Sequence, residues 1–365
     1  MARKISKRFL PRVHWNLPDA SLRLFESLAP ILQITFAATS AYLFAYYVLN
    51  HHVPMLAVTV TITSLGFSRD ARPRRIVETA TGMVTGIALS EVLLNTIGQG
   101  VWQLGLVLLI CLSVARFLSG SAAFALAAGI QSMLVIIVPA PAGGVFTRSI
   151  DGLIGGFTAI LVTALIPRDP RGLAKFDANK LFGVFLGSLD DLALALKNAD
   201  VKAADATLGQ VRKTQPLVDN WRLSLDSAIA ISKISPFLRK YRDELAGQLR
   251  LLRGMDLATR NLRVLVRRVY FLMRDGQRRP YLEDLIQQIS QATRVLSEGL
   301  ENPDRLLEAE ELFVGIIHQL DPKLFAIADQ ISEASVILLM RPLLVDLLCA
   351  SGLSVEDARA ELPKV

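Results

Sequence analysis

The sequence predicts an all-α protein in which a six-helix membrane domain is followed by a helical bundle. Hydrophobic residues make up 52% of the 365 residues, and they are concentrated between residues 29 and 166. Charged residues dominate after residue 168, where apolar residues recur at spacings of three and four, as in amphipathic helices. No segment shows a clear strand pattern. We therefore expect a basic cytoplasmic segment at 1–28, a membrane domain at 29–169 and a cytoplasmic helical domain at 170–365.

Six apolar runs form the predicted membrane domain, and a membrane helix needs about twenty such residues. The runs are 29–49, 53–67, 76–94, 101–114, 119–138 and 146–166. The first carries no charge and has the full length, whereas the second and fourth are the least secure. The small residues Gly82, Gly86, Gly152, Gly155 and Gly156 predict close helix packing in the third and sixth runs.

Basic residues between the runs predict the orientation. They precede the first run, separate the second from the third and the fourth from the fifth, and follow the sixth, whereas the alternate loops have no Lys or Arg apart from Arg148. Positive loops stay in the cytoplasm. We therefore expect a multi-pass protein of the plasma (inner) membrane with both termini cytoplasmic. Arg148 opens the sixth run on the outer side, where an alternative role is to reach toward lipid headgroups.

A short pattern occurs twice, at the starts of the third and sixth runs. Each copy has an arginine, an acid three residues later, a glycine four residues after the acid, and another small residue four further on. The copies are Arg75, Glu78, Gly82, Gly86 and Arg148, Asp151, Gly155, Ala159. Each copy opens the last run of a set of three, so the two sets cross the membrane in opposite senses. This arrangement predicts a 3+3 inverted repeat, which many transporters have.

Charged residues in membrane helices are usually functional, and an arginine suits a carboxylate ligand. We therefore interpret Arg75 with Glu78 and Arg148 with Asp151 as two gates on an anion path, at the cytoplasmic and outer ends. In each gate the acid neutralises the arginine until an anion arrives, and the acid then takes a proton. The alternative is an ion pair within one helix that only eases insertion.

Four further residues complete the predicted path. Glu91 is a second candidate proton carrier. The polar residues Gln131, Thr61 and Thr63 either line the path or bond neighbouring helices. His51 and His52 lie in an outer loop and can sense pH, although we interpret them as part of an ordinary loop.

The helical domain contains several amphipathic segments. They cover 181–196, 236–274, 282–300, 306–320 and 325–350. The second segment carries many arginines on one face, which we expect to be solvated, with anionic lipid or nucleic acid as alternative ligands. The last segment is nearly membrane-like but is interrupted by Arg341, Pro342 and Asp346, which favours a buried bundle helix or a surface docked on the membrane domain.

Catalytic motifs are absent from the sequence. It has no glycine-rich phosphate loop, no nucleophile elbow and no histidines at metal-ligand spacing. We therefore expect neither an enzyme nor a bound cofactor or metal, and no nucleic-acid partner.

The motif residues resemble those of a bacterial family. Residues 54–60, 75–86 and 148–156, placed in six runs before a helical tail, are similar to the fusaric acid resistance and aromatic acid exporter (FUSC) family. They also resemble, distantly, plant aluminium-activated malate channels. The resemblance implies export of small organic anions through the lipid bilayer, with aromatic carboxylates among them. A single membrane unit in the chain further implies a homodimer. Met55 departs from the aromatic residue that such proteins often carry there, which leaves the aromatic substrate open.

Two alternative functions follow from the same residues. A passive anion channel needs no proton gradient. A membrane scaffold needs only the arginine-rich tail to recruit a partner or lipid, but it has no use for acids and arginines inside the membrane.

Overall fold

A computed structural model describes residues 17–67, 72–139, 144, 146–166, 170–325 and 330–364. Every regular element in these residues is a helix, which confirms the all-α class. The chain divides into two compact units, described separately below. The first comprises Met1–Ser68 and Arg74–Arg168, and the second comprises Arg69–Pro73 and Asp169–Val365. Much of the predicted N-terminal segment, residues 1–16, lies outside the described residues.

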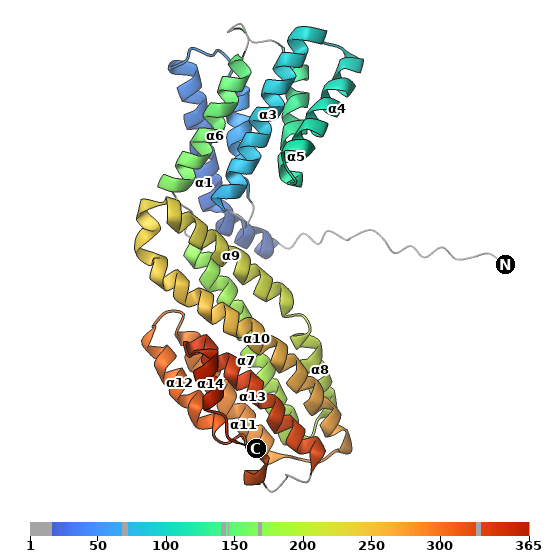
Figure 1. Ribbon diagram of the computed structural model, residues 1–365, viewed down its shortest axis with the longest axis vertical. Helices are drawn as coiled ribbons and strands as arrows, with labels where there is room; N and C mark the ends of the chain where they lie inside the picture. The colour runs from blue at the N-terminus through green and yellow to red at the C-terminus, as the bar shows by residue number, and fades with distance from the viewer. Residues whose placement is uncertain are drawn as a thin grey trace, which may run out of the picture. The chain divides into compact units, whose positions relative to one another are not determined.

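Six helices build the first unit (Figure 1). They are α1 (Leu17–Tyr47), α2 (Met55–Leu65), α3 (Pro73–Ile97), α4 (Val101–Leu118), α5 (Ala122–Ile137) and α6 (Thr147–Leu165). By length and composition, α1, α3, α4 and α6 can each cross a membrane, whereas α2 and α5 are shorter apolar helices. The predicted fourth run is therefore longer than expected, because α4 continues through Arg116 to Leu118. In each set of three helices, the second is the shortest.

Glycines allow two close helix crossings in the first unit. A Cβ added to Gly82 would lie 2.6 Å from the carbonyl oxygen of Phe124, and one added to Gly86 would overlap the backbone of Ala128. At the other crossing, a Cβ on Gly155 would overlap the carbonyl oxygen of Ala57. So α3 packs on α5 and α6 packs on α2. The third helix of each set thus contacts the second helix of the other set.

Two more glycines bring α6 against α3. A Cβ on Gly152 would lie 2.8 Å from the Cδ1 of Ile87, and one on Gly156 would lie 3.1 Å from the Cβ of Ala80. These contacts place the N-terminal half of α6 beside the middle of α3, which positions the polar residues described below.

The second unit is a bundle of antiparallel and crossing helices around one apolar core. Its helices are α7 (Pro170–Asn198), α8 (Val201–Val211), α9 (Gln215–Ile234), α10 (Arg242–Leu272), α11 (Pro280–Glu298), α12 (Asp304–Ile317), α13 (Ile331–Ser351) and α14 (Val355–Ala360). The predicted helix from Pro236 starts differently, because residues Pro236–Tyr241 form a 3₁₀ turn before α10. The predicted helix at 325–350 begins only at Ile331.

The membrane-like helix α13 packs inside this bundle. It is long and apolar enough to cross a membrane. However, its side chains Ile337, Met340 and Leu344 are fully buried in the core of the second unit. Asp346 accepts a hydrogen bond of 2.6 Å from the side-chain amide of Asn261 in α10. These contacts identify α13 as a buried bundle helix.

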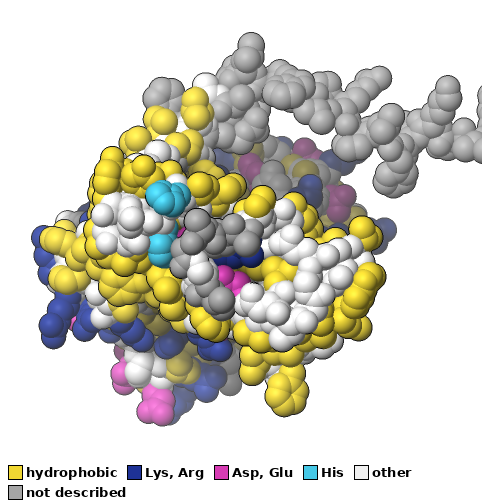
Figure 2. Space-filling model, turned by 90° about the horizontal axis from the view of Figure 1, so that it is seen from above, with side chains coloured by type: hydrophobic (Ala, Val, Ile, Leu, Met, Phe, Trp, Pro, Cys, Tyr) yellow, Lys and Arg dark blue, Asp and Glu magenta, His cyan; other side chains and the backbone are white. Residues whose placement is uncertain are grey.

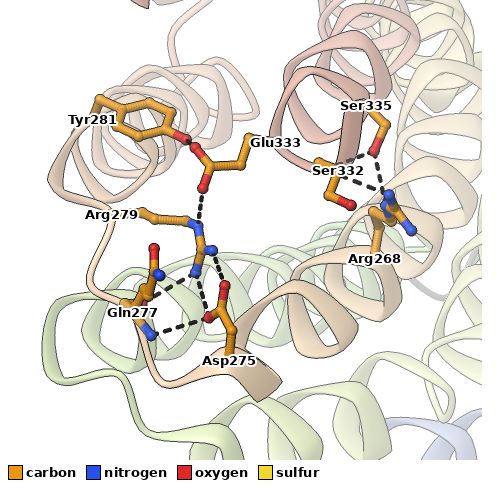
Figure 3. A network of polar contacts seen from close by, with 8 residues as sticks. All are labelled: Arg268, Asp275, Gln277, Arg279, Tyr281, Ser332, Glu333 and Ser335. Atoms are coloured by element: carbon orange, nitrogen blue, oxygen red, sulfur yellow. Dashed lines mark hydrogen bonds and ion pairs between the residues drawn. The ribbon is translucent and has the colours of Figure 1, made fainter. Parts of the chain in front are cut away.

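A polar network ties the connection between α10 and α11 to the first turn of α13 (Figure 3). The buried Arg279 guanidinium forms ion pairs with Asp275 and, at 2.7 Å, with Glu333. The hydroxyl of Tyr281 also donates to Glu333. Because every charge here has a partner, the network stabilises the bundle rather than exposing an empty ligand site.

Candidate functional site

Charged side chains are buried together at the end of the first unit where α6 begins. Arg148 and Asp151 come from the first two turns of α6, Glu91 comes from the last third of α3, and His51 comes from the connection between α1 and α2. Arg148, Asp151 and Glu91 are each less than 10% exposed. We call these four residues the charged cluster. Figure 2 views this end of the unit, where histidine, acidic and basic atoms gather near the middle and hydrophobic atoms surround them.

Glu91 caps the N-terminus of α6. Its two carboxylate oxygens accept hydrogen bonds of 3.2 Å from the backbone N–H groups of Arg148 and Ser149, and one of 2.5 Å from the Ser149 hydroxyl. The first N–H groups of a helix have no partner within the helix, and the helix dipole favours a negative charge there. The capping residue of α6 thus comes from another helix, α3, and lies 57 residues before Arg148 in the chain.

Arg148 contacts carbonyl groups rather than an acid. Its guanidinium donates hydrogen bonds of 2.6 Å to the carbonyl of Val138 and 2.8 Å to that of Pro139, just after the end of α5. The last carbonyls of a helix also lack partners within the helix and favour a cation. Arg148 thus links the end of α5 to the start of α6. Its charge is not matched by an ion pair with Asp151 among the described contacts.

Asp151 pairs instead with the imidazole of His51. The His51 Nδ1 lies 2.6 Å from the Asp151 Oδ1, where an imidazole N–H donates to the carboxylate. The side chains are 14% and 5% exposed, so this pair is shielded from solvent. An imidazole and a carboxylate in direct contact form a pair that can hold a proton or pass it on.

The charges of the cluster nearly balance. It contains one guanidinium, two carboxylates and one imidazole, so it is neutral when His51 is protonated and carries one negative charge when His51 is neutral. An anion that binds Arg148 adds a negative charge to a buried site, which strongly favours simultaneous proton uptake. The arrangement can therefore couple an anion to a proton.

The first copy of the sequence pattern lies in a different environment. Glu78 is 33% exposed and forms an ion pair of 2.9 Å with Arg74, which is itself 89% exposed. Arg75 is half-buried. The two predicted gates are therefore not equivalent. The first is half-buried, with Glu78 paired to Arg74 of its own helix, and the second is buried and connected to three other segments.

The remaining predicted residues contact neighbouring helices or their own helix. The Thr61 hydroxyl donates to the carbonyls of Ala57 and, at 3.1 Å, Gly155, which joins α2 to α6. Gln131 is buried in α5, and its amide donates to the Thr59 hydroxyl of α2 at 3.3 Å. The amide oxygen of Gln131 has no protein partner although it is buried. Thr63 is exposed and bonds the carbonyl of Thr59 in its own helix.

Sequence reasoning missed two partners in the charged cluster. It treated His51 as a loop residue, although the loop that holds it lies on the same predicted side as Arg148. It also missed Ser149, which no motif distinguishes. Contacts across 57 to 100 residues depend on how α2, α3 and α6 cross, which a single sequence does not show.

Comparison with known proteins supports a membrane function. Residues 40–162 match the model of a family described as fusaric acid resistance protein-like. An uncharacterised protein of Corynebacterium glutamicum is 30% identical over 95% of this chain and 91% of its own length. A protein of Mycobacterium tuberculosis named "Putative arylamide transporter" is 29% identical over 40% of this chain and 43% of its own length, and the Mycobacterium bovis protein of that name matches equally. No solved structure matches the chain significantly.

Proposed function

Because the chain belongs to the fusaric acid resistance protein-like family of multi-pass membrane proteins, we propose that it exports small organic anions in exchange for protons. The charged cluster at the start of α6 is the observation that carries this proposal. Polar and ionisable residues are rarely buried in a membrane domain unless they lie on a substrate or proton path. The proposal has no catalytic step, and it places the protein in the plasma membrane with both termini in the cytoplasm.

Six membrane crossings in two inverted sets form the framework of the proposed transporter. Two features support the inverted repeat: the second helix of each set is short, and the third helix of each set packs on the second helix of the other. In this topology the charged cluster faces the outer side, and Arg75 and Glu78 face the cytoplasm. The helices α2 and α5 are shorter than a full membrane span. In our proposal Gln131 of α5, whose buried amide oxygen lacks a protein partner, lines the path near the middle of the membrane.

Arg148 is the proposed anion-binding residue. Its guanidinium is held by two carbonyls, which are neutral acceptors. A carboxylate accepts two parallel hydrogen bonds from a guanidinium and also neutralises its charge, which the two carbonyls do not. An arriving carboxylate therefore replaces these carbonyls favourably, and this loosens the link between the end of α5 and the start of α6. That movement opens the outer end in our proposal.

The proton is carried by the pair of His51 and Asp151, with Glu91 as a second carrier. A proton entering from outside reaches the 14% exposed His51 before the more deeply buried acids. When the pair holds the proton the cluster itself is neutral, so an anion on Arg148 leaves one negative charge in the site instead of two. When the proton moves inward, repulsion from Asp151 favours release of the anion outward.

The main alternative is a passive anion channel driven by the membrane potential. An interior potential of −100 mV already favours outward movement of a monovalent anion by about 2.3 kcal/mol, so a passive channel would also export it. Proton coupling is therefore the part of the proposal that needs a direct test. The name of the mycobacterial relatives adds aromatic amides to the compounds worth testing.

The test is the flux of radiolabelled organic acids and arylamides in proteoliposomes, with and without a pH gradient. We expect flux of at least one carboxylate that rises when the gradient is imposed. Arg148→Gln should abolish that flux. Arg116→Gln is the matched control, because Arg116 is exposed and bonds only the nearby Gly120 carbonyl. Unchanged carboxylate flux in Arg148→Gln would overturn the anion site, and flux indifferent to the gradient would favour the channel.

A homodimer completes the proposal, since the chain carries one membrane unit. Cross-linking of the full chain in native membranes should trap a two-chain species. A purely monomeric pattern at full transport activity would remove the dimer without affecting the charged cluster.

A further inference from the structure

We propose that the second unit binds the membrane through a basic and apolar turn that recognises anionic lipid headgroups. The turn comprises residues Lys233 to Tyr241, at the end of α9 and in the 3₁₀ turn before α10, and we call it the basic turn. The beginning of α7 lies against it and contributes to the same surface. This inference rests on the family membership and not on the proposed transport mechanism.

The basic turn lies at the same end of the second unit as the start of α7. Arg171, the second residue of α7, places its guanidinium carbon 3.5 Å from the ring centre of Tyr241. Arg171 and Lys175 also form ion pairs with Glu244 at 3.8 Å and 3.6 Å. Four residues, 166–169, separate α6 from α7, and so short a connection limits how far the start of α7 can lie from the end of α6. In this proposal the connection keeps the start of α7, and with it the basic turn, near the membrane surface.

Two apolar side chains of the basic turn have no role in the bundle core. Phe237 is 63% exposed and Ile234 is 41% exposed. The neighbours Leu238 and Ser235 are buried and already fix the turn to the bundle. Folding of the second unit therefore does not require Phe237, which stands outward on a turn that is otherwise anchored.

Cations surround these apolar side chains. Residues 233–243 contain four basic residues and one acid, and Lys233, Arg239 and Lys240 are exposed. The ammonium of Lys240, bonded to the hydroxyl of Tyr241, lowers the pKa of that phenol below its ordinary value. The positive charge of the basic turn is thus concentrated beside the exposed Phe237 and Ile234.

The turn is held in shape before any ligand binds. The guanidinium of Arg242 donates hydrogen bonds of 3.0 Å and 3.2 Å to the carbonyl of Ser232 and one of 3.3 Å to that of Lys233. These bonds fix the backbone on both sides of Phe237. Little conformational entropy is therefore lost when its side chain enters the lipid headgroup region.

Anionic lipid is the ligand that fits this combination. Exposed rings and aliphatic side chains enter the headgroup region while Lys and Arg bind the acidic headgroups around them. A second copy of the same surface would bring like charges together, which disfavours self-association there. The surface therefore acts as an anchor that holds the second unit against the bilayer.

A nitroxide spin label at residue 237 tests the proposal in the full chain, reconstituted in vesicles of phosphatidylcholine and phosphatidylglycerol. The background has Cys111→Ser and Cys349→Ser, and Phe237→Cys carries the label. Leu194→Cys is the matched control, because Leu194 is 58% exposed on the same unit but lies 23 residues, about 34 Å, along α7 from Arg171. Accessibility to oxygen and to a water-soluble nickel chelate is measured by power saturation.

We expect the label at 237 to be accessible to oxygen and protected from nickel, and the label at 194 to show the reverse. The triple variant Lys233→Gln, Arg239→Gln, Lys240→Gln, or vesicles of phosphatidylcholine alone, should return the label at 237 to water, since each basic residue contributes about fivefold to binding of an anionic surface. Nickel accessibility at 237 equal to that at 194 would overturn the proposal. Protection from both reagents would also overturn it, because it would indicate contact with protein.

Discussion

Replacement of Glu91 by glutamine should weaken the fold of the membrane unit far more than the same change at Glu78. Glu91 accepts three hydrogen bonds from the start of α6, all of them buried. A carboxamide has one acceptor oxygen, so the glutamine can keep the two bonds from Ser149, each weakened by about 1 kcal/mol because the acceptor is neutral. It loses the bond from the Arg148 N–H, worth about 1.5–3 kcal/mol, because that N–H then faces an NH2 donor. The lost charge at the helix terminus adds about 0.3–1 kcal/mol. We expect Glu91→Gln to lower the free energy of unfolding by about 4–6 kcal/mol.

Glu78→Gln is the matched control on the same helix. Glu78 is partly exposed, and its ion pair with Arg74 spans one helical turn, for which about 0.3–0.5 kcal/mol is expected. About 2–4 °C of melting temperature corresponds to 1 kcal/mol in a unit of this size. Thermal unfolding of the detergent-solubilised full chain should therefore shift by about 8–24 °C in Glu91→Gln and by about 1–2 °C in Glu78→Gln. Equal shifts in the two variants would refute the assignment of Glu91 as the cap of α6.

Three further predictions concern packing and charge elsewhere in the chain. Gly86→Ala should destabilise the chain by about 1–3 kcal/mol, because the new Cβ overlaps the backbone of Ala128. The control Gly105→Ala, which has open space around it, should be neutral or slightly stabilising. Equal melting temperatures of the two variants would contradict the crossing of α3 and α5. Arg279→Met should lower the free energy of unfolding by about 3–5 kcal/mol, because it leaves the carboxylates of Asp275 and Glu333 without their cation. The control Arg294→Met, at an exposed pair with Asp190, should lower it by less than about 1 kcal/mol. Thermal melts of both variants measure the difference. Burial raises the pKa of Asp346 above its ordinary value, so its protonated form stabilises the fold at acid pH and this stabilisation is lost as pH rises through the raised pKa. Asp346→Asn should therefore match the wild type near pH 4 and be more stable at pH 7, and a stability difference that does not change with pH would contradict this account.

Most of the helices could be predicted from local pattern alone. The six apolar runs of the first half overlap α1 to α6, because length and hydropathy are properties of contiguous residues. The segment at 325–350 shows where this reasoning ends. Its composition suits a membrane as well as a protein core, and only the packing of Ile337, Met340 and Leu344 against the bundle decides between them.

The sequence singled out three of the four residues of the charged cluster but not their pairings. The sequence pattern singled out Arg148, Asp151 and Glu91, because charges are unusual in apolar runs. It paired Arg148 with Asp151 by their spacing along one helix. In the structure, unpartnered groups at helix ends compete for these side chains: the end of α5 binds Arg148 and the start of α6 binds Glu91, which leaves Asp151 to His51. Such competition depends on tertiary contacts and has no signature in a local spacing.

Proton movement during anion flux tests the central claim most directly. Full-length chain is reconstituted in liposomes that contain a pH indicator, with the membrane potential clamped and protein-free liposomes as the control for leakage of the acid. The account predicts that flux of the transported carboxylate is accompanied by proton flux in the wild type, and that Asp151→Asn uncouples or abolishes it. Carboxylate flux without proton movement in the wild type, at the same rate in Asp151→Asn, would contradict it.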